Sequence, residues 1–333
     1  MTLVIFVGCT PSKPKQGLIP LTEDSQKIVS TRPQMLNTHM MVILKLKSPA
    51  LLNDSEKQNG KTVVDSVYLD QVKKEQDNVL VELKKISSDI QVVYKYKYVL
   101  NAVCIIVPKA LMDQVAKLGL ISTWENVSVF SRPENIQTLN VSTQNTSITE
   151  KNSSKFIGAE KLNLLGITGK GIKVGVLDTG IDYTHSMLGG IGTKEAYKAV
   201  NPSEAALGYP NQKVVGGIDL VGTHYDGASP DFRLRVPKPD TNPIDEAGHG
   251  THVAGSVAGL GDGINSYNGM APDADLYSIK VFGADGSTSD MVVIAGLEFA
   301  VDPNGDDDLG DQLRIQDPRS QPYHWLNHQH RKL

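Results

Sequence analysis

The sequence has few of the residues on which several classes of protein depend. Its 333 residues include only two cysteines, Cys9 and Cys104, which excludes a disulfide-rich scaffold and a four-thiolate zinc site. Basic residues are not in excess, and the net charge of −4 gives no support for a nucleic-acid partner. No apolar run approaches the roughly 20 residues that a membrane-spanning helix requires. With 40% hydrophobic residues, the chain is expected to be a soluble globular protein of about two domains.

Residues 1–38 are expected to be an export signal followed by a tether. The apolar run Leu3–Val7 ends in Gly8-Cys9, and a polar stretch containing Pro, Ser and Lys follows. The Gly-Cys end resembles the lipobox of bacterial lipoproteins, in which the cysteine is acylated. Secretory signals carry a basic segment before the apolar run, but only two residues precede the run here. The signal is therefore interpreted as clipped. This predicts an exported protein, extracellular or lipid-anchored at the cell envelope through Cys9; the alternative is a buried first strand.

Residues 39–135 predict a small α+β unit. A strand is expected at 40–47, an amphipathic helix from Val67, and a half-buried strand at 94–98, where Tyr and Lys alternate. A continuous apolar strand at 102–107, a short helix at 111–118 and a last strand at 127–130 follow. This β-α-β-β-α-β order is typical of a ferredoxin-like fold. Residues 136–156, rich in Ser, Thr and Asn, are expected to form an exposed linker.

Residues 157–308 have a different pattern, in which apolar strands alternate with helices. The runs 172–177 and 274–282 are mostly apolar, as expected for a parallel sheet that is covered on both faces. A helix is expected from about Ser289, a plausible N-cap. The segment therefore predicts an open α/β domain.

Two motifs in this second unit carry chemistry. Asp178 follows the apolar run 174–177, at the carboxyl end of a strand, where open α/β sheets place functional groups. His249 stands between two glycines, and small residues continue the segment as a helix that can pack tightly. A carboxylate that holds an imidazole in one tautomer supplies two members of a Ser-His-Asp relay.

These motifs resemble those of the subtilisin-like serine proteases, or subtilases. The resemblance rests on Asp-Thr-Gly-Ile-Asp at 178–182, Gly-His-Gly-Thr-His-Val-Ala-Gly at 248–255, and the stretches 270–272 and 280–286, and it covers residues 157 to about 308. It implies a serine endopeptidase acting on polypeptides, in which Asp178 orients His249 and His249 is the general base. Residues 39–135 are similar, more weakly, to the inhibitory propeptide of that family, which implies an intramolecular contact between the two units.

The resemblance also implies a substrate-binding edge at Gly286, Ser287 and Thr288, whose main chain would pair with an extended peptide. The extended end of the first unit, 127–133, could pair with the same edge. An ordinary turn at 286–288 is the plainer alternative.

Other chemistries are less well supported by the residues. Aspartic proteases use two Asp-Thr-Gly copies, and this chain has one. His249 and His252 could bind a metal, but the Glu of a His-Glu-x-x-His motif is missing, and His252 is interpreted as a packing residue. Residues 302–308 resemble the start of a calcium loop but have Asp307 and Leu313 where Gly and Glu are required, so they are interpreted as a solvated acidic turn. No cofactor is predicted.

The chain departs from the family pattern after Asp308. The 25 residues that follow contain no oxyanion-hole Asn and no Gly-Thr-Ser-type nucleophile, and three of the last ten are His. Residues 309–333 are therefore interpreted as a non-homologous tail, from a frameshift or truncation. We expect the polypeptide as given to lack peptidase activity and to leave apolar faces of 172–177 and 274–282 open. The alternatives are a propeptide-type inhibitor or folding chaperone, or a gene product without function.

Overall fold

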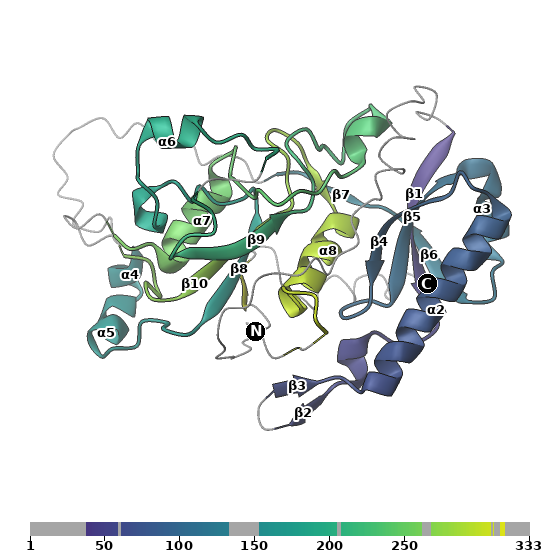
Figure 1. The fold of residues 1–333 in the computed structure, drawn as a ribbon, viewed down its shortest axis with the longest axis horizontal. Helices are drawn as coiled ribbons and strands as arrows, with labels where there is room; N and C mark the ends of the chain where they lie inside the picture. The colour runs from purple at the N-terminus through teal and green to yellow at the C-terminus, as the bar shows by residue number, and fades with distance from the viewer. Residues whose placement is uncertain are drawn as a thin grey trace.

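The computed structural model describes residues 38–58, 61–132, 153–204, 208–261, 268–307, 309 and 314–316 (Figure 1). The predicted export signal and tether, nearly all of the predicted linker and most of the predicted tail lie outside these ranges. Within the described ranges, no helix has both the length and the apolar character needed to cross a membrane.

The N-terminal unit is a four-stranded antiparallel sheet with strand order β4-β5-β1-β6. Helices α2 and α3 and two 3-10 turns connect its strands. A short hairpin, β2–β3, precedes α2 and was not predicted. The bounds are β1 His39–Leu46, η2 Leu51–Asp54, β2 Glu56–Gln58, β3 Lys61–Val63, α2 Ser66–Ile86, β4 Gln91–Tyr96, β5 Ala102–Pro108, η3 Lys109–Leu111, α3 Met112–Ala116 and β6 Ile121–Asn126.

The long helix α2 forms for reasons that are visible in the sequence. Asp65 caps it by accepting the N–H of Val67 at 2.7 Å, and two lysines stand in the last turn, where a positive charge is favourable. Val72, Val79 and Leu83 lie seven and four residues apart and are buried. They therefore share one face, and Val79 and Leu83 pack on the apolar side of the sheet.

The last strand of this sheet is β6 rather than the predicted 127–130, which is a correction. Only Ile121 of β6 is buried. The other residues of this strand are mostly polar, so the sequence of β6 gives almost no apolar signal. Residues 127–130 leave the sheet instead, and β7 (Val129–Phe130) pairs antiparallel with β11 (Thr288–Ser289) of the second unit.

The second unit contains a parallel sheet of order β12-β8-β10-β9. Its α-helices are α4 to α8, and two 3-10 turns lie in its loops. The bounds are α4 Ser153–Phe156, α5 Ala159–Leu164, β8 Lys173–Asp178, η4 Ser186–Leu188, α6 Lys194–Lys198, β9 Val214–Asp219, η5 Phe232–Arg235, α7 His249–Ala258, β10 Asp275–Lys280, α8 Asp290–Val301 and β12 Arg314–Gln316. Strand β12 lies beyond the predicted boundary at 308 and pairs with β8.

Both faces of the central strands β8 and β10 are covered, so the expectation of open apolar faces is wrong. On one face, α7 packs through Ala254 and Ala258 on Val176 and Leu276. On the other face, α8 lies between the parallel sheet and the sheet of the N-terminal unit (Figure 1). The N-terminal unit thus completes a core that the second unit only half closes.

The contact between the units also explains two aromatic residues of β4. Tyr94 and Tyr96 are fully buried rather than half-buried as predicted. Their hydroxyls donate to the carbonyls of Leu220 and Met291, each at 2.7 Å. A buried Tyr hydroxyl requires such a partner, and here the partner comes from the other unit.

The acidic turn at 302–307 belongs to the same contact and is not solvated as predicted. Asp302 is buried, and its carboxylate lies 2.6 Å from the hydroxyl of Tyr98. Asp307 forms ion pairs with Lys73 of α2, at 2.7 Å, and with Lys97. The turn therefore binds the N-terminal unit by charge.

Candidate active site

The predicted pairing of Asp178 and His249 is present in the structure. Asp178 is the last residue of β8, and His249 is the first residue of α7. The Nδ1 atom of His249 lies 2.8 Å from each carboxylate oxygen of Asp178. Elements 71 residues apart in the chain thus bring the two side chains into hydrogen-bond contact.

The surroundings of the pair favour a fixed imidazole. The Asp178 carboxylate is almost fully buried and also accepts the N–H of Thr179 at 2.7 Å. Burial raises the pKa of Asp178, and the hydrogen bonds from His249 and Thr179 oppose that rise only in part. The His249 side chain remains 16% exposed. Because Nδ1 faces Asp178, the Nε2 atom is the one available for proton transfer.

No serine in the described ranges is hydrogen-bonded to this imidazole. Ser256 bonds the carbonyl of His252, Ser278 bonds the carbonyl of Pro243, and Ser287 bonds the carboxylate of Asp226. These three serine hydroxyls are therefore bonded to groups other than His249.

Comparison with known proteins finds a family match over the segment that contains this pair. Residues 169–312, which include both Asp178 and His249, match the model of the subtilase family. The segment belongs to the subtilase family.

Three relatives show how far the likeness extends. The chain is 38% identical to the minor extracellular protease Vpr of Bacillus subtilis (strain 168), over 46% of this chain and 15% of that protein. It is 34% identical to subtilisin DY of Bacillus licheniformis, over 44% and 38%, and 36% identical to subtilisin Savinase of Lederbergia lenta, over 40% and 35%. The chain thus spans 15% to 38% of the length of these relatives.

The glycine after His249 is required by the close approach of α7 to β8 in the subtilase segment. A Cβ atom on Gly250 would lie 2.2 Å from the carbonyl oxygen of Gly180 and 3.1 Å from the Cβ of Asp178. No side chain fits there, because the carbonyl of Gly180 belongs to the backbone and cannot turn aside. Gly255, in the same helix, has no neighbour within 4 Å of such a Cβ.

We therefore expect opposite results from two Gly→Ala substitutions in α7. Gly250→Ala should lower the free energy of unfolding by about 2 kcal/mol, because the added methyl forces the helix away from β8. Gly255→Ala should raise it by about 0.5–1 kcal/mol, the usual gain in helix propensity. Urea unfolding of the full chain measures both. Equal effects of the two substitutions would contradict the packing described here.

Of the predicted substrate edge, only Thr288 takes part in strand pairing. Thr288 pairs with Phe130, and Ser289 pairs with Val129. Gly286 packs instead against the backbone of Tyr225, and Ser287 bonds Asp226. The residues that pair, Thr288 and Ser289, directly precede α8, because residues 286 and 287 are held in the turn before them.

Two further residues of the motifs, His252 and Asp182, differ in their roles. His252 is exposed, so its interpretation as a packing residue is wrong; it lies on the solvent side of α7. Asp182 accepts from Thr184, and its N–H donates to Thr251 of α7. Asp245, a buried carboxylate in the loop before α7, was not predicted, because a single Asp in an irregular loop carries no pattern.

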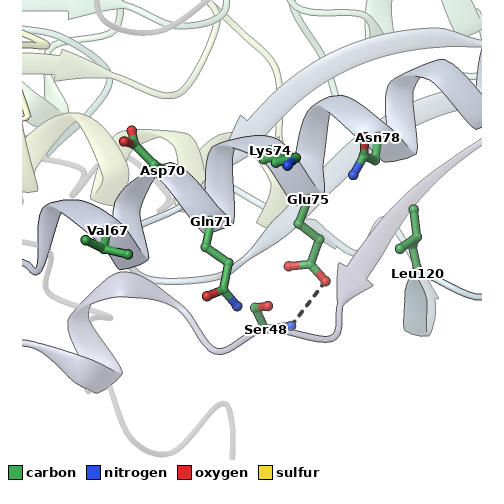
Figure 2. A pocket seen from close by; sticks show the side chains of 8 residues that line it. All are labelled: Ser48, Val67, Asp70, Gln71, Lys74, Glu75, Asn78 and Leu120. Carbon is green, nitrogen blue, oxygen red and sulfur yellow. Dashed lines mark hydrogen bonds between the residues drawn. The ribbon is translucent and has the colours of Figure 1, made fainter.

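Among the residues that the structure describes, no second candidate site has comparable chemistry. In the described ranges, no group of three His, Cys, Asp or Glu side chains is arranged to hold a metal ion. A cavity of about 480 Å³ lies on the N-terminal unit beside α2, and its lining includes Asp70, Lys74 and Glu75 (Figure 2). Glu75 is already occupied there by the N–H of Ser48. The cavity belongs to a different unit from Asp178 and His249, and we assign it no role in the candidate active site.

Proposed function

We propose that the chain carries the Asp and His of a serine endopeptidase that cleaves polypeptides. The observation that supports this most directly is the 2.8 Å contact between His249 Nδ1 and Asp178, at a strand end and a helix start. Asp178 fixes the tautomer in which Nε2 accepts a proton. His249 then takes the proton of a serine hydroxyl as it attacks the peptide carbonyl, and returns it to the leaving amine.

The nucleophile of this reaction has no counterpart in residues 1–333. No segment there resembles the Gly-Thr-Ser motif or the oxyanion-hole Asn of the family. Residues 1–333 by themselves are accordingly proposed to be inactive. We expect no cleavage of casein and no labelling by a fluorophosphonate probe, and labelling that disappears in Ser256→Ala would contradict this.

The family function itself is tested in a chimera. Residues 169–312 would replace the segment that they match in the protease Vpr, so that the remaining parts of the site come from the relative. The chimera should hydrolyse casein, and it should lose that activity with His249→Gln. A folded chimera that is inactive would reject the assignment of Asp178 and His249.

The N-terminal unit is proposed to be a propeptide-type inhibitor and folding chaperone with a ferredoxin-like fold. The antiparallel order β4-β5-β1-β6 and the pairing of β7 with β11 support this. Peptide recognition by addition of a strand relies on main-chain hydrogen bonds, so β7 would occupy the edge that an extended substrate uses. On this basis the edge at 286–288 extends to Ser289, and Arg132, which donates to the carbonyl of Ala284, continues along it.

Export belongs to the same proposal. Two observations support it: an apolar run ends in Gly8-Cys9, and the relative Vpr is named as an extracellular protease. Anchoring through Cys9 would follow from acylation of that cysteine.

A further inference from the structure

The N-cap residue of α7 supplies no side-chain cap to the first turn of the helix. The N–H groups of the first residues of a helix have no partner within the helix. The N-cap residue, Gly248, has a φ of 91° and no side chain with which to accept one of them. The orientation of His249, the first residue of this helix, therefore depends on acceptors from outside the helix.

Asp245 supplies acceptors to the two residues just before α7 and to Thr251 in its first turn. Its Oδ1 atom accepts the N–H groups of Ala247 and Gly248 at 2.9 and 2.8 Å. Its Oδ2 atom accepts the N–H and the hydroxyl of Thr251 at 2.9 and 2.6 Å. The carboxylate is 2% exposed, and none of the ion pairs among the described residues includes it. The Asp245 carboxylate is thus held by hydrogen bonds, and four of these come from residues around the start of α7.

The same carboxylate also reaches the strand that carries Asp178. The Thr179 hydroxyl donates to Asp245 Oδ1 at 2.8 Å and accepts the N–H of Gly250 at 2.9 Å. Thr179 directly follows Asp178, and Gly250 directly follows His249. These hydrogen bonds therefore connect Thr179, which follows Asp178, with Gly250, which follows His249.

The loop that carries Asp245 is itself held by the parallel sheet. Lys280, at the end of β10, is fully buried. Its ammonium donates to the carbonyl of Ile244 at 3.1 Å and to Glu246 at 2.7 Å. Both residues adjacent to Asp245 are thus fixed, so the carboxylate has a defined place relative to the strand ends.

We infer that Asp245 is a positioning residue for His249, acting through Thr179 and the first turn of α7. This inference rests on the proposed function, since it concerns the same imidazole. Only a carboxylate suits this place, because it accepts at both oxygens. The amide of Asn would turn an NH₂ group toward either the Thr179 side or the Thr251 side, where the existing groups are donors.

The test follows the Nδ1 proton of His249 by NMR in the full chain with isotope-labelled histidine, and His249→Gln identifies the signal. In the wild type, the bond to Asp178 should protect this proton from exchange with water. In Asp245→Asn, exchange should be at least about 10-fold faster, the change expected from losing buried hydrogen bonds. Asp65→Asn, at the cap of α2, is the matched control and should leave the signal unchanged.

A second pair of variants keeps the inference testable if Asp245→Asn does not fold. Thr179→Val preserves the shape but removes the hydroxyl, and it should also accelerate exchange. Thr179→Ser retains the hydroxyl and should restore protection. An unchanged signal in Asp245→Asn, or equal protection in the two Thr179 variants, would overturn the inference. Absence of a protected signal in the wild type would instead reject the Asp178–His249 pairing and, with it, the proposed function.

Discussion

Asp178→Asn is expected to lower kcat of the active chimera about 10⁴-fold, with little change in KM, as found for the equivalent change in a Ser-His-Asp triad. The reason lies in the hydrogen bonds of the carboxylate. Oδ1 of Asp178 accepts the N–H of Thr179, so an Asn would keep its oxygen there and place its NH₂ group at the Oδ2 position, 2.8 Å from His249 Nδ1. The imidazole would then accept a hydrogen bond at Nδ1 and carry its proton on Nε2. With Nε2 protonated, His249 cannot act as the general base.

Asp182→Asn is the matched control for that substitution. Asp182 lies four residues further along the chain, and its carboxylate accepts from Thr184 rather than from the imidazole. Its replacement should change kcat by less than about 10-fold, in line with the small effect of removing one hydrogen bond. Steady-state rates on a peptide substrate compare the two variants. A comparable loss in both would mean that general disruption, and not the tautomer of His249, causes the effect.

The parts of the site that could be predicted are those with local signals. The apolar run before Asp178 identifies a buried strand, and the small residues after His249 identify a helix that packs closely. That the two side chains meet was expected from the resemblance to the subtilases, in which the Asp orients the His. The observed contact of 2.8 Å joins the end of β8 to the start of α7.

The missed parts depend on contacts distant in the sequence. Strand β9 contains Gly216 and Gly217, which weaken its strand signal. They are needed because a Cβ on Gly217 would lie 2.0 Å from the carbonyl oxygen of Ser278 in β10. The complete burial of Tyr94 and Tyr96 likewise results from the other unit. Asp245 is recognisable only when the helix start that it caps has been placed in space.

Glu298 is the residue whose loss should most weaken the contact between the two units. It lies on α8, and its buried carboxylate accepts the N–H groups of Lys97, Tyr98 and Val99 at 2.7 to 3.0 Å. These donors form the turn between β4 and β5 of the N-terminal unit. Glu298→Ala removes the acceptor for all three. Since an unsatisfied buried donor costs about 1–3 kcal/mol, we expect the free energy of unfolding to fall by about 3 kcal/mol or more.

The measurement is urea unfolding of the full chain, together with hydrogen exchange of the amides at 97–99, which should lose protection. Glu82→Ala, at an exposed ion pair with Lys85 on α2, is the control and should change stability by less than about 0.5 kcal/mol. Retained protection of these amides in Glu298→Ala would show that another group holds the turn.

The contribution of Glu298 should also depend on pH. Burial, opposed by the three N–H donors, raises the pKa of Glu298 to about 7, whereas an unfolded Glu has a pKa of about 4.3. The folded protein therefore binds this proton more tightly than the unfolded chain does. The stability linked to the proton is complete below the unfolded pKa and is lost as pH rises toward 7. Wild type should thus lose more stability than Glu298→Ala between about pH 4 and pH 8, and a parallel decline of the two would show that Glu298 is not the titrating group.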